Sequence, residues 1–106
     1  MRKPGEDCVK LVAYHRLAIV ELFASSAYYG EEFPENGKRF INAVEQAIED
    51  ARKQPLFGRP EGKGCRSWRV KKFPYRVMYR LEPERFRVMA VADLRRKPGY
   101  WLERAE

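Results

Sequence analysis

Apolar residues along this chain repeat first at helical spacing and then at strand spacing. In residues 15–30 they recur every three or four positions, which predicts a helix that ends at Gly30. Residues 38–53 show the clearest helical pattern, with one apolar and one charged face, and Pro55 stops it. A short connection that contains the loop 33–37 separates the two segments, so we expect them to pack as an antiparallel helical hairpin.

Four other segments have the length and pattern of strands, namely residues 9–14, 65–70, 75–81 and 86–92. Residues 55–64 contain three glycines and two prolines and are predicted to be a loop. The expected order is therefore β-α-α-β-β-β. This is an α+β fold, in which the helical hairpin packs on one side of a small, mostly antiparallel sheet.

The strand predicted at residues 75–81 has two different faces. Its odd-numbered positions are aromatic or aliphatic and should pack on the helices, whereas Arg76 and Arg80 share the other face. The next strand, at residues 86–92, leads directly into a cationic run. Together these positions outline an anion-binding surface. The residues assigned to it are Arg76, Arg80, Arg95, Arg96 and Lys97.

Length and charge narrow the class of protein. The 106 residues are expected to form one domain, with residues 1–8 frayed and residues 100–106 forming a last helical turn or a frayed end. Residues 1–54 hold 8 Lys/Arg and 9 Asp/Glu, and residues 55–106 hold 14 and 6, so the net charge of +7 comes from the C-terminal half. No apolar run is long enough for a membrane span, and the start of the chain lacks the apolar core of a signal peptide, so we expect a cytoplasmic protein.

Three motifs in this order resemble a known family. They are GRP at residues 58–60, PYRVMYRL at 74–81 and VMAVADLRRKPGYW at 88–101. Together with the predicted element order they are similar to the RelE/ParE superfamily of bacterial toxins, and to its ParE-like plasmid stabilisation branch. The resemblance spans residues 9–104. It implies a bacterial type II toxin–antitoxin system in which a cognate antitoxin holds the toxin inactive.

The superfamily contains two mechanisms. RelE-like members cut messenger RNA on the ribosome, and ParE-like members inhibit DNA gyrase. By position, the nucleases' phosphate-contacting arginine corresponds to Arg76, and the basic residue after their last strand to Arg96. Their two strand lysines fall on Ser67 and Arg69, so only one of these positions stays basic, and their C-terminal tyrosine lies near Tyr100. Many plasmid stabilisation relatives carry a histidine where this chain has Asp93.

The residues themselves favour binding over cleavage. RNA cleavage needs a base for the 2′-hydroxyl, an acid for the leaving oxygen and cations for the phosphorane. Arg69, Arg76 and Arg96 supply cations, but Asp93 is flanked by arginines that should lower its pKa, and Tyr100 serves only if its pKa is strongly perturbed. We therefore expect a toxin that acts by binding, and the resemblance implies DNA gyrase as its target. A ribosome-dependent mRNA endoribonuclease and a non-toxic nucleic-acid-binding module remain the alternatives.

Partner contacts are expected from the large apolar side chains, which exceed what so small a chain can bury. The resemblance names the partner as the antitoxin. The residues expected to face it are Phe23, Tyr28, Tyr29, Trp68 and Trp101. The only histidine, His15, stands at a helix start and is expected to be structural, and neither Cys8 nor Cys65 has metal-ligand spacing, so no metal and no cofactor is expected.

Overall fold

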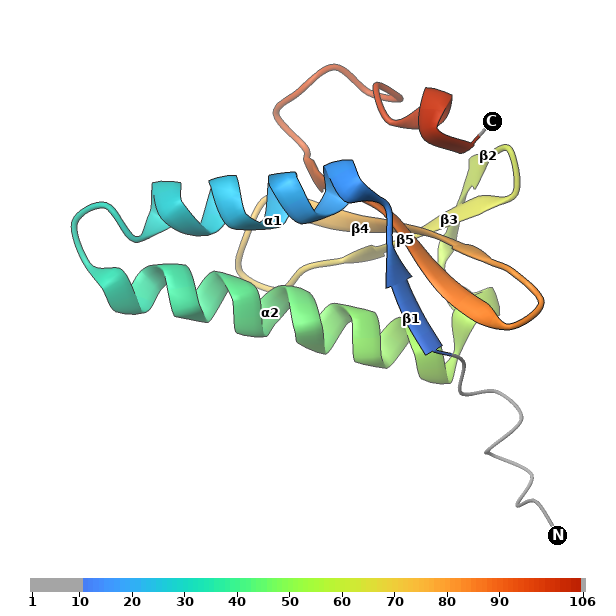
Figure 1. Cartoon of the computed structure of the whole chain (residues 1–106), viewed down its shortest axis with the longest axis horizontal. Helices are drawn as coiled ribbons and strands as arrows, with labels where there is room; N and C mark the ends of the chain where they lie inside the picture. Colours follow the sequence, from blue (N-terminus) through green and yellow to red (C-terminus); the bar gives the residue numbers. More distant parts are fainter. Residues whose placement is uncertain (1–10, 106) are drawn as a thin grey trace, which may run out of the picture.

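The computed structural model of the chain describes residues 11–105 (Figure 1). Its elements are, in order, β1 (Leu11–Tyr14), α1 (Arg16–Tyr29), α2 (Pro34–Lys53), the 3-10 helix η2 (Pro55–Phe57), β2 (Arg59–Gly62), β3 (Cys65–Arg69), β4 (Tyr75–Leu81), β5 (Arg85–Asp93) and the 3-10 helix η3 (Leu102–Ala105). Cys8, the first two residues of the expected first strand and the segment expected to be frayed lie outside the described residues.

The strands form one five-stranded sheet in the order β1-β5-β4-β3-β2. β1 runs parallel to β5, and the other three pairings are antiparallel. The hairpin of α1 and α2 packs on one face of this sheet (Figure 1). The predicted α+β fold and its mostly antiparallel sheet are confirmed. No helix among residues 11–105 is both long enough and apolar enough to cross a membrane.

The prediction of an unbroken loop at residues 55–64 is wrong. This segment contains η2 and the strand β2, which pairs with β3 at the edge of the sheet. An edge strand tolerates Pro60 because a proline there breaks no bond to a second neighbour. Gly62 and Gly64 have φ of 94° and 77°, which lets the chain reverse tightly into β3.

The helix α2 begins at Pro34, within the segment 33–37 that was predicted to be a loop. Proline is favoured in the first turn of a helix, where its missing N–H has no partner to lose. Gly37 lies inside this helix because α1 passes close by. A Cβ on Gly37 would stand 2.7 Å from the carbonyl oxygen of Ser26, and the Ser26 hydroxyl donates to the Gly37 carbonyl at 3.1 Å.

The main core lies between the hairpin and the sheet. Tyr75, Val77 and Tyr79 of β4 face the helices and are 3%, 0% and 0% exposed, as their alternation predicted. The Tyr79 ring stacks on Phe86 with 4.6 Å between centroids, and its hydroxyl donates to the carbonyl of Pro55 at 2.6 Å. A Cβ at residue 58 would lie 1.9 Å from that hydroxyl, so the tyrosine requires the glycine of the GRP motif.

The opposite face of the sheet is covered by the C-terminal segment, residues 94–105. Figure 1 shows this segment on the side of the sheet away from α2. Trp101 is 3% exposed and packs in a second apolar cluster with Cys65, Met78 and Met89. The residues after β5 therefore close a second, smaller core.

Candidate functional site

The two arginines predicted to form an open face of β4, Arg76 and Arg80, are both half-buried. The Arg80 guanidinium donates to the carbonyl of Ala105 at 2.6 Å and pairs with Glu82 at 3.3 Å. The prediction that Arg80 belongs to an open anion-binding face is therefore wrong, because its guanidinium is engaged by an acid and by the chain end. The cause is that residues 94–105 fold back over β4, which pattern analysis of a single strand does not reveal.

Arg76 belongs to a polar chain at the edge formed by β2 and β3. Its Nε donates to the Ser67 hydroxyl at 2.8 Å, and that hydroxyl donates to Glu61 Oε2 at 2.5 Å. Glu61 also accepts from Arg59 at 2.9 Å. Burial lowers the pKa of Arg76, and the nearby Arg59 lowers it further. Arg69 lies opposite Arg76 in the strand register and is exposed.

Arg96 lines a small cavity of about 160 Å³ between β2 and the C-terminal segment. Lys97 and Tyr100 line it on the same side as Arg96, and Arg59 and Glu61 line it from β2. The other two members of the predicted catalytic set, Arg69 and Arg76, do not line it. Arg76 reaches it only through Ser67 and Glu61.

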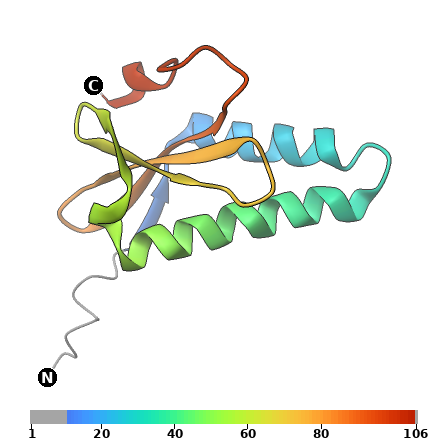
Figure 2. The same ribbon diagram turned by 180° about the vertical axis from the view of Figure 1, so that it is seen from behind.

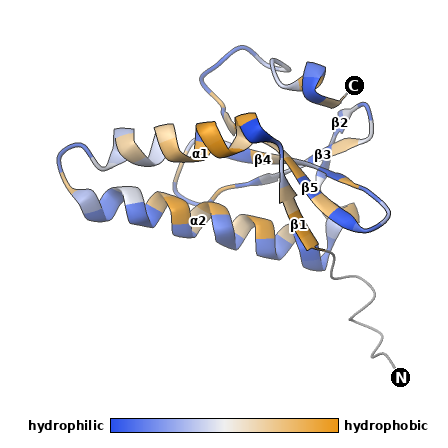
Figure 3. Ribbon diagram, viewed as in Figure 1, coloured by the Kyte–Doolittle hydropathy of each residue, from blue (hydrophilic) through white to orange (hydrophobic). Residues whose placement is uncertain are grey.

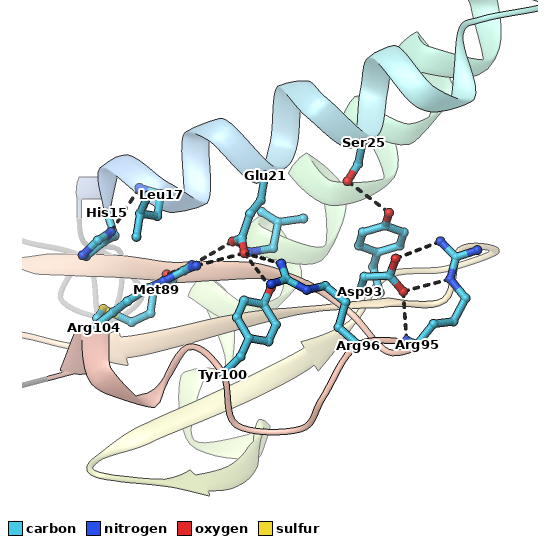
Figure 4. A network of polar contacts seen from close by, with 12 residues as sticks. His15, Leu17, Glu21, Ser25, Met89, Asp93, Arg95, Arg96, Tyr100 and Arg104 are labelled. Atoms are coloured by element: carbon cyan, nitrogen blue, oxygen red, sulfur yellow. Dashed lines mark hydrogen bonds and ion pairs between the residues drawn. The ribbon is translucent and has the colours of Figure 1, made fainter.

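Glu21 organises the C-terminal segment (Figure 4). Its carboxylate accepts from the Tyr100 hydroxyl at 2.5 Å and from both terminal nitrogens of Arg104, at 2.8 and 3.0 Å. It also accepts from the main-chain N–H of Val91 at 3.1 Å, and Arg96 lies 3.8 Å away. Glu21 and Arg104 are only 12% and 11% exposed at their side chains, so this is a largely buried ion pair.

The pKa of Tyr100 is shifted in the direction that prevents it from acting as a catalytic base. Burial raises the pKa of its hydroxyl, and the hydrogen bond to Glu21 raises it further. The Arg96 guanidinium stacks on the Tyr100 ring at 3.9 Å from its centroid. Tyr100 is therefore held protonated, as a hydrogen-bond donor and a stacking platform.

Asp93 and Arg95 form a bidentate pair, with two contacts of 2.9 Å between side chains (Figure 4). The hydrogen bonds from Arg95 lower the pKa of Asp93, as predicted. Arg95 remains 55% exposed at its side chain, and Lys97 is exposed and forms no ion pair among residues 11–105. The basic run after β5 thus keeps a cationic surface despite this internal pair.

The residues expected to face a partner divide into three kinds. Phe23 and Tyr28 are 59% and 58% exposed on the outer side of α1. Tyr29 and Trp68 are half-buried against the main core. Trp101 is buried in the second core, so the expectation that it is free to meet a partner is wrong. Its ring packs on the sheet because the C-terminal segment turns back.

Hydrophobic residues occur along much of the length of α1 (Figure 3). Its solvent-facing side chains include Ile19, Val20, Phe23, Ala24, Ala27 and Tyr28. A helix that is apolar all round is normally buried on all sides. We call these six residues the α1 apolar face.

Sequence reasoning missed Glu21, Glu61 and Arg104. Glu21 carried a usable signal, because it is the single charged residue between Leu17 and Tyr29, and a lone acid in an apolar helix usually has a buried partner. Glu61 lay in a segment predicted to be a loop. His15 is structural as predicted, since its Nδ1 accepts from the N–H of Leu17 at 3.1 Å and caps α1.

No group of three or more His, Cys, Asp or Glu side chains that could hold a metal ion occurs within residues 11–105. Cys65 is a free, buried thiol, and burial raises its pKa. The chemistry on offer at this site is therefore cation-rich binding around a small cavity, next to an exposed apolar helix.

Comparison with known proteins identifies the fold and the family of the chain. Among solved structures, the chromosomal ParDE toxin–antitoxin system of P. aeruginosa is similar, with a TM-score of 0.71 and 14% sequence identity over 82% of this chain and 98% of that chain. A likeness at this identity establishes the fold. No curated protein sequence matches. The family model described as the ParE toxin of the type II toxin–antitoxin system parDE matches residues 12–98, most of the chain. The chain therefore belongs to the ParE toxin family.

Proposed function

We propose that this toxin inhibits growth by binding DNA gyrase and that a cognate antitoxin neutralises it. The observation that carries the choice of mechanism is the state of the candidate proton-transfer groups. Tyr100 is held protonated against Glu21, Asp93 is paired with Arg95, and Glu61 accepts from Arg59 and Ser67. A cation-rich surface without a free base favours binding over RNA cleavage.

The target-binding surface in this proposal is the basic run Arg95, Arg96 and Lys97, together with the half-buried Arg76 and Arg80 of β4. Guanidinium groups suit carboxylates and phosphates, both of which a nucleoprotein target offers. The likeness to the RelE/ParE nucleases keeps ribosome-dependent mRNA cleavage as the competing function. In that reading Arg69, Arg76, Arg96 and Tyr100 would be catalytic.

The antitoxin in this proposal covers the α1 apolar face. Phe23 and Tyr28 supply exposed rings of the kind that anchor tight interfaces. An acidic partner would also complement the net charge of +7. We expect a dissociation constant on the order of nanomolar. Failure of the adjoining gene's product to form a stable complex at micromolar concentrations would count against this part of the proposal.

The mechanism is tested by two assays on one preparation of the purified chain. We expect inhibition of DNA supercoiling by purified gyrase, and no new cut sites when a translated message is read by primer extension. A chain with Arg76→Ala serves as the control in both assays. Codon-phased cuts that disappear in this variant, together with unaffected supercoiling, would replace the gyrase proposal with the nuclease function.

A further inference from the structure

A groove of about 550 Å³ lies between α2 and the turn that joins β3 to β4. Figure 2 shows that turn beside α2, on the side of the molecule turned away in Figure 1. Tyr29, Ala43, Ala47 and Phe73 contribute its apolar surface and are buried or half-buried. The groove does not include the basic run after β5.

The rim of the groove is rich in positive charge. It carries Arg39, Arg69, Lys71 and Lys72, all exposed, and none of them forms an ion pair within residues 11–105. Among the described residues, the hydrogen-bond acceptors of Arg39 and Arg69 are neutral, namely the side chain of Asn36 at 3.4 Å and the carbonyl of Tyr75 at 3.5 Å. One acid, Asp50, lines the groove and accepts from Gln46 at 2.9 Å.

Four cations against one acid over an apolar floor fit a ligand that is acidic and also carries apolar side chains. Stacking of a nucleobase is disfavoured, because the Tyr29 ring is stacked on Phe40 with 5.2 Å between centroids and meets Phe73 edge-on at 4.9 Å. The small Ala43 and Ala47 leave room for aliphatic side chains. Lys72 also adopts a left-handed backbone with φ of 70°, where glycine or asparagine is usual.

We propose that this groove binds an acidic, apolar-anchored peptide segment of the antitoxin. This inference rests on the proposed function, which supplies the antitoxin as a partner. What it adds is the position of the antitoxin's acidic segment on the toxin. The groove adjoins the α1 apolar face, because Tyr29 lines the groove while its neighbour Tyr28 meets it edge-on at 5.2 Å. One chain can therefore cross α1 and continue past Lys71 and Lys72.

The test reverses charge on the rim without changing the residues assigned to target binding. The variant is Lys71→Glu with Lys72→Glu, and the matched control is Lys38→Glu with Lys53→Glu, two exposed lysines of α2 outside the groove. Each pair changes the net charge equally. We expect the antitoxin encoded by the adjoining gene to bind the rim variant at least about 30-fold more weakly than wild type, and the control within about threefold.

Two further measurements on the same proteins distinguish failure of the groove assignment from failure of the proposed function. Inhibition of gyrase supercoiling by the wild-type chain and the rim variant without antitoxin should be equal, and it reports on the proposed function independently of the groove. Equal antitoxin affinity for the rim variant and the control would overturn the groove assignment and leave the proposed function standing. Rim-dependent binding of a single-stranded oligothymidylate would overturn it in favour of nucleic acid. Loss of supercoiling inhibition in the rim variant, with antitoxin binding intact, would assign the groove to the target instead.

Discussion

The two faces of the sheet are covered in different ways. On one face, the helical hairpin buries a core of aromatic and aliphatic side chains, with Tyr79 and Phe86 fully buried. On the other face, a single short segment covers a smaller core, and buried polar contacts of Glu21 hold it in place. The stability gained by burying apolar area is spread over many side chains, so one polar change has little effect on it. A buried ion pair, in contrast, stops stabilising the fold when either partner is removed.

This difference also divides the proposed work of the molecule. The hairpin side carries an exposed apolar surface suited to a tight protein partner. The C-terminal side carries cations suited to a charged target. Damage to one side should therefore leave the other side's function measurable, provided that the fold survives.

The largest effect on stability is expected at Tyr79. Tyr79→Ala deletes a fully buried ring and should lower the free energy of unfolding by about 4 kcal/mol, which lowers the melting temperature by more than about 10 °C. Tyr79→Phe, which removes only the hydrogen bond to Pro55, should cost about 1 kcal/mol. Thermal melts of both variants measure the difference, and equal losses would show that the ring does not pack as described.

A slightly smaller effect is expected at Glu21, and it should be local. Glu21→Gln leaves the Arg104 guanidinium nearly buried without its counter-charge, which should cost about 3 kcal/mol. Hydrogen exchange should accelerate first in residues 100–105 and only later in the hairpin. The exposed Glu32→Gln serves as control. Uniform acceleration over the whole chain would contradict the view that Glu21 holds this segment in particular.

The next effect is a dependence of stability on pH in the acid range. Because Arg95 holds the pKa of Asp93 below its usual 3.8, the pair stabilises the fold fully above about pH 4 and loses this contribution as the pH falls further. Melting temperatures of wild type and Asp93→Asn should therefore differ near about pH 6 and converge in stronger acid. A gap that widens as the pH falls would contradict the assigned direction of the pKa shift.

The smallest effect on stability is expected at Phe23, which is 59% exposed. Phe23→Lys should change the free energy of unfolding by no more than about 0.5 kcal/mol, as for other surface substitutions. The same variant should escape neutralisation when it is co-expressed with the antitoxin. Lys38→Ala provides a surface control, and full neutralisation of the Phe23 variant would remove the α1 apolar face from the interface.

The sequence predicted most of the fold because its strongest signals are local. Helical spacing in α2 and the alternation of Tyr75, Val77 and Tyr79 need no knowledge of distant residues. The strand β2 escaped prediction because Pro60 and two glycines are typical of loops, and only pairing with β3 makes them a strand.

The site was less predictable because its residues meet across long separations. Glu21 contacts Tyr100 and Arg104, which follow it by 79 and 83 positions. The burial of Trp101 and the pairing of Arg80 with the chain end depend on the same return of residues 94–105 over the sheet. The residue types showed where the cations are in the sequence. The local pattern did not show which of these cations bind a buried group in the folded chain.

The division of work between the two sides is tested most directly by growth after induction without antitoxin. Arg76→Ala combined with Arg96→Ala removes cations from the C-terminal side. Because Arg76 donates to Ser67, we expect a loss of stability of about 1 kcal/mol and a folded protein. We expect cells expressing this double variant to grow normally, whereas cells expressing Phe23→Lys should still be inhibited. A double variant that melts as a folded protein and still stops growth would show that the cations of the C-terminal side do not bind the target.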